Sequence, residues 1–250
     1  MARSADAARG SLAAVALLAA ALAGCGVTTT QEKDARLTVK ADRTIAKPPK
    51  ASAVAHGGDV EVTGTAILRG KDETAIAVRV RNTSSHPVND VPLLVGIHSE
   101  GGKDEYVNLE RGTSYFQSHV ASIAPDDDAT WIFASKKEIP DGKPFAKVGA
   151  PEDPPLTVAE SLPSLEVSQR PEAGGKDGGT LQVEVANSSD VPQYELELYA
   201  WAEDGKKLLA AGTADVAELE GGAKATVRLP LVGDPGKAPV EVFVPPTIFE

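Results

Sequence analysis

Two stretches of the chain alternate between apolar and polar or small residues with a period of two. One is IAVRVR at residues 76–81, and the other is LQVEVA at residues 181–186. This period is typical of a β-strand with one buried face. Both stretches end in turn-forming residues, at 82–87 and 187–192. The pattern therefore predicts two strands that are each followed by a tight turn.

The two stretches belong to a longer correspondence within the chain. Residues 82–93 align with residues 187–198 without a gap, so that Asn, Ser and Pro recur at the same places in the turn. Further on, residues 123–133 have the layout of residues 219–229, namely an apolar residue, a polar turn and a strand. Corresponding residues are 105 positions apart in the turn but 96 positions apart in this later stretch. The first copy therefore carries a longer middle, near residues 100–118. We interpret the pattern as two tandem copies of one β unit.

Short strands separated by frequent turns are typical of β-sandwiches. We therefore predict an all-β protein with two tandem immunoglobulin-like β-sandwiches, at residues 52–149 and 163–250. A proline-rich linker at residues 150–162 separates them, and its prolines favour a short extended connection. The stretch 214–219 is the one place where we expect a turn of helix.

The N-terminal residues have the composition of a secretory signal. Arg3 and Arg9 precede an apolar stretch at residues 12–23, which is shorter than the ~20 residues that span a bilayer. Residues 1–24 are therefore predicted to be a signal peptide. Residues 25–51 are polar and contain a Lys-Pro-Pro-Lys run, so we expect a flexible tether there.

The run Leu22-Ala23-Gly24-Cys25 resembles the bacterial lipobox. In lipoproteins with this motif, the cysteine thiol receives a diacylglyceryl group and a peptidase cuts before the cysteine. The resemblance implies that Cys25 is the lipidation site and holds the protein on the extracytoplasmic face of a bacterial cell membrane. The alternative is an ordinary signal peptide with a cysteine at its cleavage site. Whether the envelope has one membrane or two stays open.

A second resemblance concerns residues 180–232. The strand Leu-Glu-Leu-Tyr-Ala at residues 196–200 and the turn Asp-Gly-Lys at residues 204–206 resemble the FxLYD family of bacterial surface modules. Leu replaces the family's Phe, and Ala replaces its Asp. The family shares a fold and no common chemistry, so the resemblance implies an architecture and not an activity.

Charge and cysteine content narrow the function classes. The chain has a net charge of -11 and a single cysteine. The acidic surface argues against nucleic acid and against electrostatic binding to anionic lipid, although a cationic partner stays open. No disulfide can form within the chain, so we expect each sandwich to be stabilised by apolar burial alone.

A search for chemistry gives no catalytic, cofactor-binding or metal-binding residue. The histidines, His56, His86, His98 and His119, lack close metal-ligand spacing and have no second cysteine to join them. The consecutive acids of residues 126–128 fit a solvated turn better than a calcium loop. No Gly-x-Ser-x-Gly elbow occurs. We therefore expect no enzyme and no cofactor.

The two tryptophans are predicted to pack internally. Trp131 fits a core position. Trp201 alternates with Leu196 and Leu198 and should face the opposite side of its strand. That orientation makes Trp201 a candidate for the interface between the sandwiches, with an exposed partner contact as the alternative.

Two functional hypotheses follow. The first is a lipid-anchored, non-enzymatic interaction or spacer module with a possible protein partner at the cell envelope. The alternative is a binding protein for a small molecule or a cell-wall glycan, with its site at the junction of the two sandwiches or near Tyr115. Tyr106, Phe116 and His119 would belong to the second of these sites. A hydrolase is the least favoured class, and the partner and the oligomeric state stay open.

Overall fold

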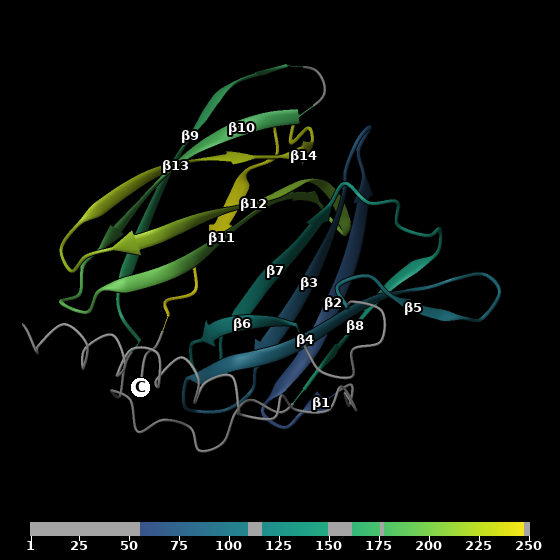
Figure 1. The fold of residues 1–250 in the computed structure, drawn as a ribbon, viewed down its shortest axis with the longest axis horizontal. Coiled ribbons are helices and arrows are strands. Elements are labelled where there is room, and N and C mark those ends of the chain that lie inside the picture. The colour runs from purple at the N-terminus through teal and green to yellow at the C-terminus, as the bar shows by residue number, and fades with distance from the viewer. Residues whose placement is uncertain (1–55, 110–116, 150–161, 176–177, 248–250) are drawn as a thin grey trace, which may run out of the picture. The chain divides into compact units, whose positions relative to one another are not determined.

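The computed structural model describes residues 56–109, 117–149, 162–175 and 178–247 (Figure 1). The predicted signal peptide, the tether and almost all of the linker lie outside these residues. Everything described below belongs to one compact unit, Pro48–Glu250. The described residues contain strands and no helix, so the predicted all-β class is confirmed. None of them forms a helix of the length and apolarity that a membrane span requires.

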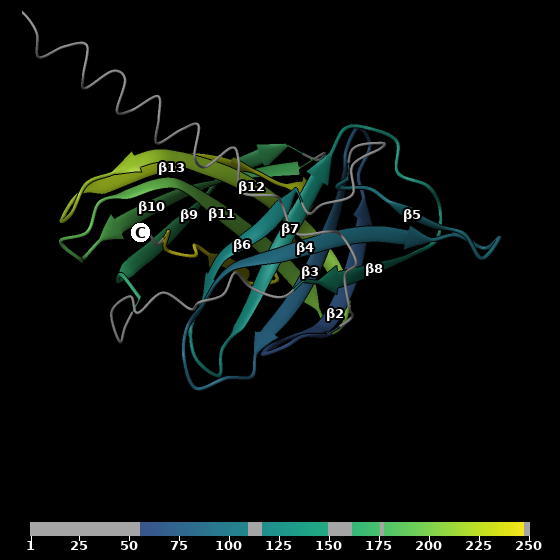
Figure 2. The same ribbon diagram turned by 60° about the horizontal axis from the view of Figure 1, so that its bottom comes forward.

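The first half of the described chain builds two antiparallel sheets. Its strands are β1 (His56–Gly57), β2 (Val60–Arg69), β3 (Thr74–Asn82), β4 (Val88–His98), β5 (Asp104–Tyr106), β6 (Ser118–Ile123), β7 (Asp128–Ser135) and β8 (Lys143–Val148). One sheet has the order β1-β2-β3-β7. In the other sheet, β4 pairs with β5, β6 and β8, as the turned view of Figure 2 shows.

The second half also builds two antiparallel sheets. Its strands are β9 (Leu165–Gly175), β10 (Gly178–Asn187), β11 (Gln193–Asp204), β12 (Lys207–Leu219), β13 (Lys224–Pro230), β14 (Val232–Gly233) and β15 (Val240–Phe243). The sheet orders are β9-β10-β13 and β14-β12-β11-β15 (Figure 1).

The strand order of the first half recurs in the second. The order β2-β3-β7 corresponds to β9-β10-β13, and the order β6-β4-β8 corresponds to β12-β11-β15. In both halves the third long strand, β4 or β11, crosses to the second sheet, and the fifth long strand, β7 or β13, returns to the first. Two copies of one folding unit would produce this recurrence.

Strand β3 departs from the sequence prediction because it is buried on both faces. Ile76 and Val78 lie on one face, and Ala75 and Ala77 lie on the other; none of the four is more than 2% exposed. Arg79 shares the face of the two alanines, and its guanidinium pairs with Glu203 of β11. The prediction of one buried face is therefore wrong here, because the sheet containing β11 and β12 covers the other face.

The β14-β12-β11-β15 sheet is likewise buried on both faces. Leu196 and Leu198 lie in the hydrophobic cluster of the second half. Tyr199 lies in the cluster of the first half, and Trp201 packs against that cluster. The predicted orientation of Trp201 is confirmed. The sheet therefore forms the second layer of its own sandwich and also covers the β2-β3-β7 face.

Residues 214–219 are extended and not helical. They belong to β12, and Val216 pairs with Leu196 across the antiparallel ladder. The expected turn of helix is therefore wrong. The alanine and acidic residues of this stretch have weak β-propensity, but pairing with β11 determines its conformation.

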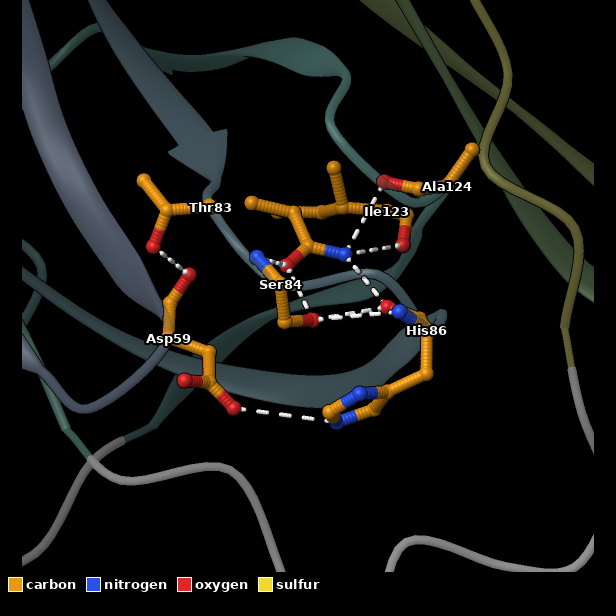
Figure 3. Close-up of polar contacts among 7 residues, drawn as sticks. Asp59, Thr83, Ser84, His86, Ile123 and Ala124 are labelled. Carbon is orange, nitrogen blue, oxygen red and sulfur yellow. Dashed lines mark hydrogen bonds and ion pairs between the residues drawn. The ribbon is translucent and has the colours of Figure 1, made fainter.

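A buried asparagine closes the turn after β3 (Figure 3). The Asn82 side chain is fully buried, and its Nδ2 donates to the carbonyls of His86 at 2.8 Å, Ile123 at 3.3 Å and Ala124 at 2.9 Å. The backbone N–H and the hydroxyl of Ser84 donate to Asn82 Oδ1 at 3.0 and 2.8 Å. One amide thus satisfies buried carbonyls from two segments that are distant in sequence.

The equivalent turn after β10 is closed in the same way. Nδ2 of Asn187 donates to the carbonyls of Val191 at 2.8 Å and of Leu219 and Glu220 at 3.3 Å each. The backbone N–H and the hydroxyl of Ser189 donate to Asn187 Oδ1. The recurring Asn and Ser of the sequence therefore have one structural role in both turns.

Candidate functional site

The residue that the sequence singled out for modification, Cys25, lies outside the described residues. Its lipidation stays a prediction from the run at residues 22–25. Tyr115 and Phe116 also lie outside the described residues, so the structure places only Tyr106 and His119 of the predicted aromatic site.

The predicted site at the junction of the two sandwiches is occupied by packed side chains. Leu208, Ala211 and Val232 of the second half belong to the hydrophobic cluster of the first half. The Trp131 and Tyr199 rings lie 6.4 Å apart across the junction. These residues make the junction a continuation of the core, stabilised by apolar burial.

Two ionisable groups on β11 lie within this junction. The Tyr199 hydroxyl donates to Glu197, and burial, the Glu197 charge and this hydrogen bond raise the pKa of Tyr199 far above its usual value. Glu203 pairs with Arg79, while its second carboxylate oxygen is buried and has no hydrogen-bond partner in the described part of the chain. The Arg79–Glu203 pair joins β3 to β11, whereas the Tyr199–Glu197 contact lies within β11.

The described histidine side chains each pair with an aspartate. The distances are 3.6 Å for His86 Nε2 to Asp59 (Figure 3), 2.6 Å for His98 Nδ1 to Asp104 and 3.2 Å for His119 Nδ1 to Asp90. The three pairs lie on different segments of the first half. No group of three metal-ligating side chains occurs among the described residues.

Asp126 and Asp127 lie in the turn before β7, and Asp128 is the first residue of that strand. Arg81 donates to the Asp128 carboxylate at 2.9 Å, and the Asp128 backbone N–H donates to the Asp127 carboxylate at 2.8 Å. Asp126 adopts a positive φ of 54°, a conformation that Asp tolerates in turns. These are the contacts of a solvated turn.

Tyr106 belongs to a mixed aromatic and basic surface on the sheet formed by β4, β5 and β8. In the register of this sheet, Gly96 of β4 lies between Tyr106 of β5 and Phe145 of β8, and Leu94 of β4 lies beside Lys147 of β8. The intervening β4 residues Leu93, Val95 and Ile97 belong to the hydrophobic core. Tyr106, Phe145 and Lys147 therefore share the opposite face, which we call the outer face.

The side chains of the outer face are in mutual contact. The Tyr106 and Phe145 rings meet edge to face, with centroids 5.7 Å apart and an interplanar angle of 65°. The Lys147 ammonium lies 5.7 Å from the Tyr106 centroid and 5.8 Å from the Phe145 centroid, in cation–π range, and donates to the Tyr106 hydroxyl at 3.1 Å.

Gly96 is required for this arrangement. A Cβ at Gly96 would lie 2.5 Å from the Phe145 ring and 2.8 Å from the Glu105 carbonyl oxygen. The ring therefore occupies the space that any other side chain would fill, and it lies across the strand. The result is an aromatic surface at the centre of the outer face.

The sequence pattern identified Tyr106 but missed Phe145 and Lys147. The signal was present in the alternation of Lys143, Phe145 and Lys147 along β8, which places all three on one face. Their proximity to Tyr106 depends on β4 pairing with β5 on one side and β8 on the other, which the sequence does not reveal.

No protein-family model matches the chain, and no curated protein matches it. The lipobox and FxLYD resemblances therefore stay resemblances.

Proposed function

We propose that this chain is a lipid-anchored protein of the extracytoplasmic face of the bacterial cell membrane, in which two sandwiches act together as a non-enzymatic interaction or spacer module. The observation that supports it most is the burial of Leu198 and Tyr199. These neighbours on β11 point to opposite sides, and neither is more than 2% exposed. One sheet therefore serves two packed interfaces.

This arrangement favours a fixed pair of sandwiches over two that swivel on a linker. Undocking would expose Tyr199 and Leu208 to water and would uncover Ala77 of β3. Exposing one large apolar side chain costs about 1.5–3 kcal/mol. A fixed pair holds any binding surface at a defined distance from its anchor, which suits both a spacer and an interaction module.

The anchoring part of the proposal rests on the sequence. Leu22-Ala23-Gly24-Cys25 would supply the lipid, and the predicted tether at residues 25–51 would connect it to the sandwiches. Two acyl chains hold a protein on a bilayer where one is marginal, at about 0.8 kcal/mol per buried CH₂.

Replacement of the lipidation residue tests the anchor. Cys25→Ser should move the protein from the membrane fraction to the soluble extracytoplasmic fraction, whereas Ser85→Ala in an exposed turn should leave it in the membrane fraction. If Cys25→Ser stays with the membrane as tightly as the unchanged protein, the anchor is refuted.

Crosslinking in intact membranes distinguishes an interaction module, which binds a protein partner, from a spacer, which does not. A photo-reactive residue at Val191, which is 48% exposed on the second sandwich, should give a discrete adduct if the module binds a protein. The same residue at Ser85 of the first sandwich serves as the control. Adducts that depend on the position favour a partner, and their absence from both positions favours a spacer. Hydrolysis of an envelope polymer by the purified protein would refute a non-enzymatic role.

A further inference from the structure

We propose that the outer face of the β4, β5 and β8 sheet binds a carboxylated saccharide of the cell envelope. One sugar ring would lie against the Phe145 and Tyr106 pair, and carboxylates of different sugar units would be held by Lys147 and Lys143. The proposal names a ligand class for the proposed interaction module, and it rests on the extracytoplasmic location given above.

The two aromatic rings of the outer face lie outside the hydrophobic core. Tyr106 and Phe145 are half-buried, yet neither belongs to either hydrophobic cluster of the described residues. They lie on the face of the sheet that is turned away from the core. The face of an aromatic ring is negative, so it attracts the polarised C–H groups on the flat side of a sugar ring.

Lys143 and Lys147 flank Phe145 on the same face of β8, about 14 Å apart along an extended strand. Within the described residues, neither lysine has a carboxylate within ion-pair distance, although the chain carries a net charge of -11. The contacts of Lys147 are the Tyr106 hydroxyl and the two aromatic rings, which leave its positive charge in place. A carboxylate ligand complements two ammonium groups that have no ion-pair partner.

The acid of the outer face is engaged by a neighbour other than the lysines. Asp104 pairs with His98 on the outer face, with Nδ1 and Oδ1 2.6 Å apart. The carboxylate is therefore engaged by a neighbour on the same sheet and not by either lysine. Positive charge is left at the aromatic surface, in a protein whose overall charge repels long polyanions such as nucleic acids.

Gly96 gives the Phe145 ring its place, because a Cβ at Gly96 would lie 2.5 Å from that ring. No side chain of residue 96 therefore separates Phe145 from Tyr106, and the two rings meet edge to face. The spacing of the lysines suits a short oligosaccharide better than a single small anion.

The test uses full-length protein purified from membranes in detergent, titrated with oligogalacturonate by calorimetry. A neutral oligogalactose of the same length lacks the carboxylates and should bind at least about tenfold more weakly, because it cannot accept charge-assisted hydrogen bonds from the lysines. Lys147→Gln should weaken oligogalacturonate binding by at least about tenfold for the same reason. Lys224→Gln, which removes a lysine paired with Glu184 on β13, should leave it unchanged.

A second variant tests the ring without relying on charge. Phe145→Leu keeps an apolar side chain over Gly96 and should reduce affinity for the oligosaccharide while the thermal transition is retained. If Phe145→Leu fails to fold, the titration of Lys147→Gln alone decides whether the outer face binds the saccharide. A polymer of glycerol phosphate that binds as tightly as the saccharide would assign the site to phosphate and overturn the proposal.

Three other results would also overturn it: no saturable binding of oligogalacturonate, equal binding of the neutral oligosaccharide, and unchanged binding by Lys147→Gln. These results leave the anchor untouched, because fractionation of Cys25→Ser does not depend on the outer face. If the anchor fails, the same titration is done with full-length protein purified from the soluble fraction.

Discussion

Asn82 and Asn187 make the same hydrogen bonds in two turns that lie 105 positions apart in the chain. Each Nδ2 donates to one carbonyl of its own turn and to two carbonyls of a later segment, and each Oδ1 accepts from a serine two residues on. Only an amide side chain of this length offers two donors and an acceptor together. The recurrence is therefore a structural requirement of each sandwich.

Asn82→Ala is expected to lower the free energy of unfolding by about 2–3 kcal/mol, because it leaves buried carbonyls without a donor. Asn82→Asp should destabilise at least as much, since a carboxylate faces the same carbonyls. Chemical denaturation monitored by circular dichroism measures both effects. Asn187→Ala should cost a similar amount.

Ser85→Ala is the matched control for the asparagine variants. Ser85 is an exposed residue of the same turn, so its replacement should change stability by less than about 0.5 kcal/mol. Equal effects of Ser85→Ala and Asn82→Ala would show that the turn tolerates loss of the amide, contrary to the prediction.

The ion pair of Arg79 and Glu203 is expected to couple the two sandwiches. Its side chains are 36% and 16% exposed, so a single replacement leaves the other charge partly desolvated. Arg79→Met and Glu203→Met should each destabilise by about 2 kcal/mol, and the double variant should recover part of the loss. A double-mutant cycle should give a coupling energy of about 1–2 kcal/mol. A coupling near zero would mean that the pair contributes nothing to docking.

Much of the fold was predictable because its determinants are local. Alternation with a period of two and the turn residues after residues 81 and 186 specify strands without reference to the rest of the chain. The recurring Asn and Ser marked equivalent turns, which the hydrogen bonds of Asn82 and Asn187 show to be alike.

The packing of one sandwich on the other was only partly predictable: the alternation around Trp201 indicated a residue of the interface, but alanine is compatible with both a buried and an exposed face. Ala75 and Ala77 are buried because β12 covers their face of β3. Residues 214–219 were wrongly expected to be helical for a related reason: their conformation follows from pairing with β11. The contact of Tyr106 with Phe145 depends on strands joined through β4, so neither segment alone reveals it.

Trp201→Ala is expected to separate the unfolding of the two sandwiches. Trp201 belongs to β11 but packs against the hydrophobic cluster of the first half, so its loss creates a gap at the junction. The cost should be about 2–4 kcal/mol, and calorimetry should resolve two transitions where the unchanged protein shows one. Val191→Ala, at a 48% exposed position, should retain one transition. Two transitions in the unchanged protein would contradict a docked pair.

The stability of the protein is expected to fall above about pH 10 because of Tyr199. Burial first, and then the charge and hydrogen bond of Glu197, raise the pKa of this tyrosine far above its ordinary value in the folded state. The folded protein thus holds the Tyr199 proton more tightly than the unfolded chain does. The contribution is fully present below the unfolded pKa near 10 and is lost progressively as the pH rises above it.

Comparison with Tyr199→Phe isolates this contribution, since phenylalanine has no proton to lose. From pH 8 to about pH 11, the free energy of unfolding of the unchanged protein should fall by about 1.4 kcal/mol more than that of Tyr199→Phe, as measured by urea denaturation. Tyrosinate absorbance gives an independent reading: folded samples of the two proteins should absorb equally at this pH, and a difference should emerge on unfolding. Parallel pH profiles, or a tyrosinate signal from Tyr199 in the folded protein, would show that the hydroxyl is accessible and that the junction is not closed around it.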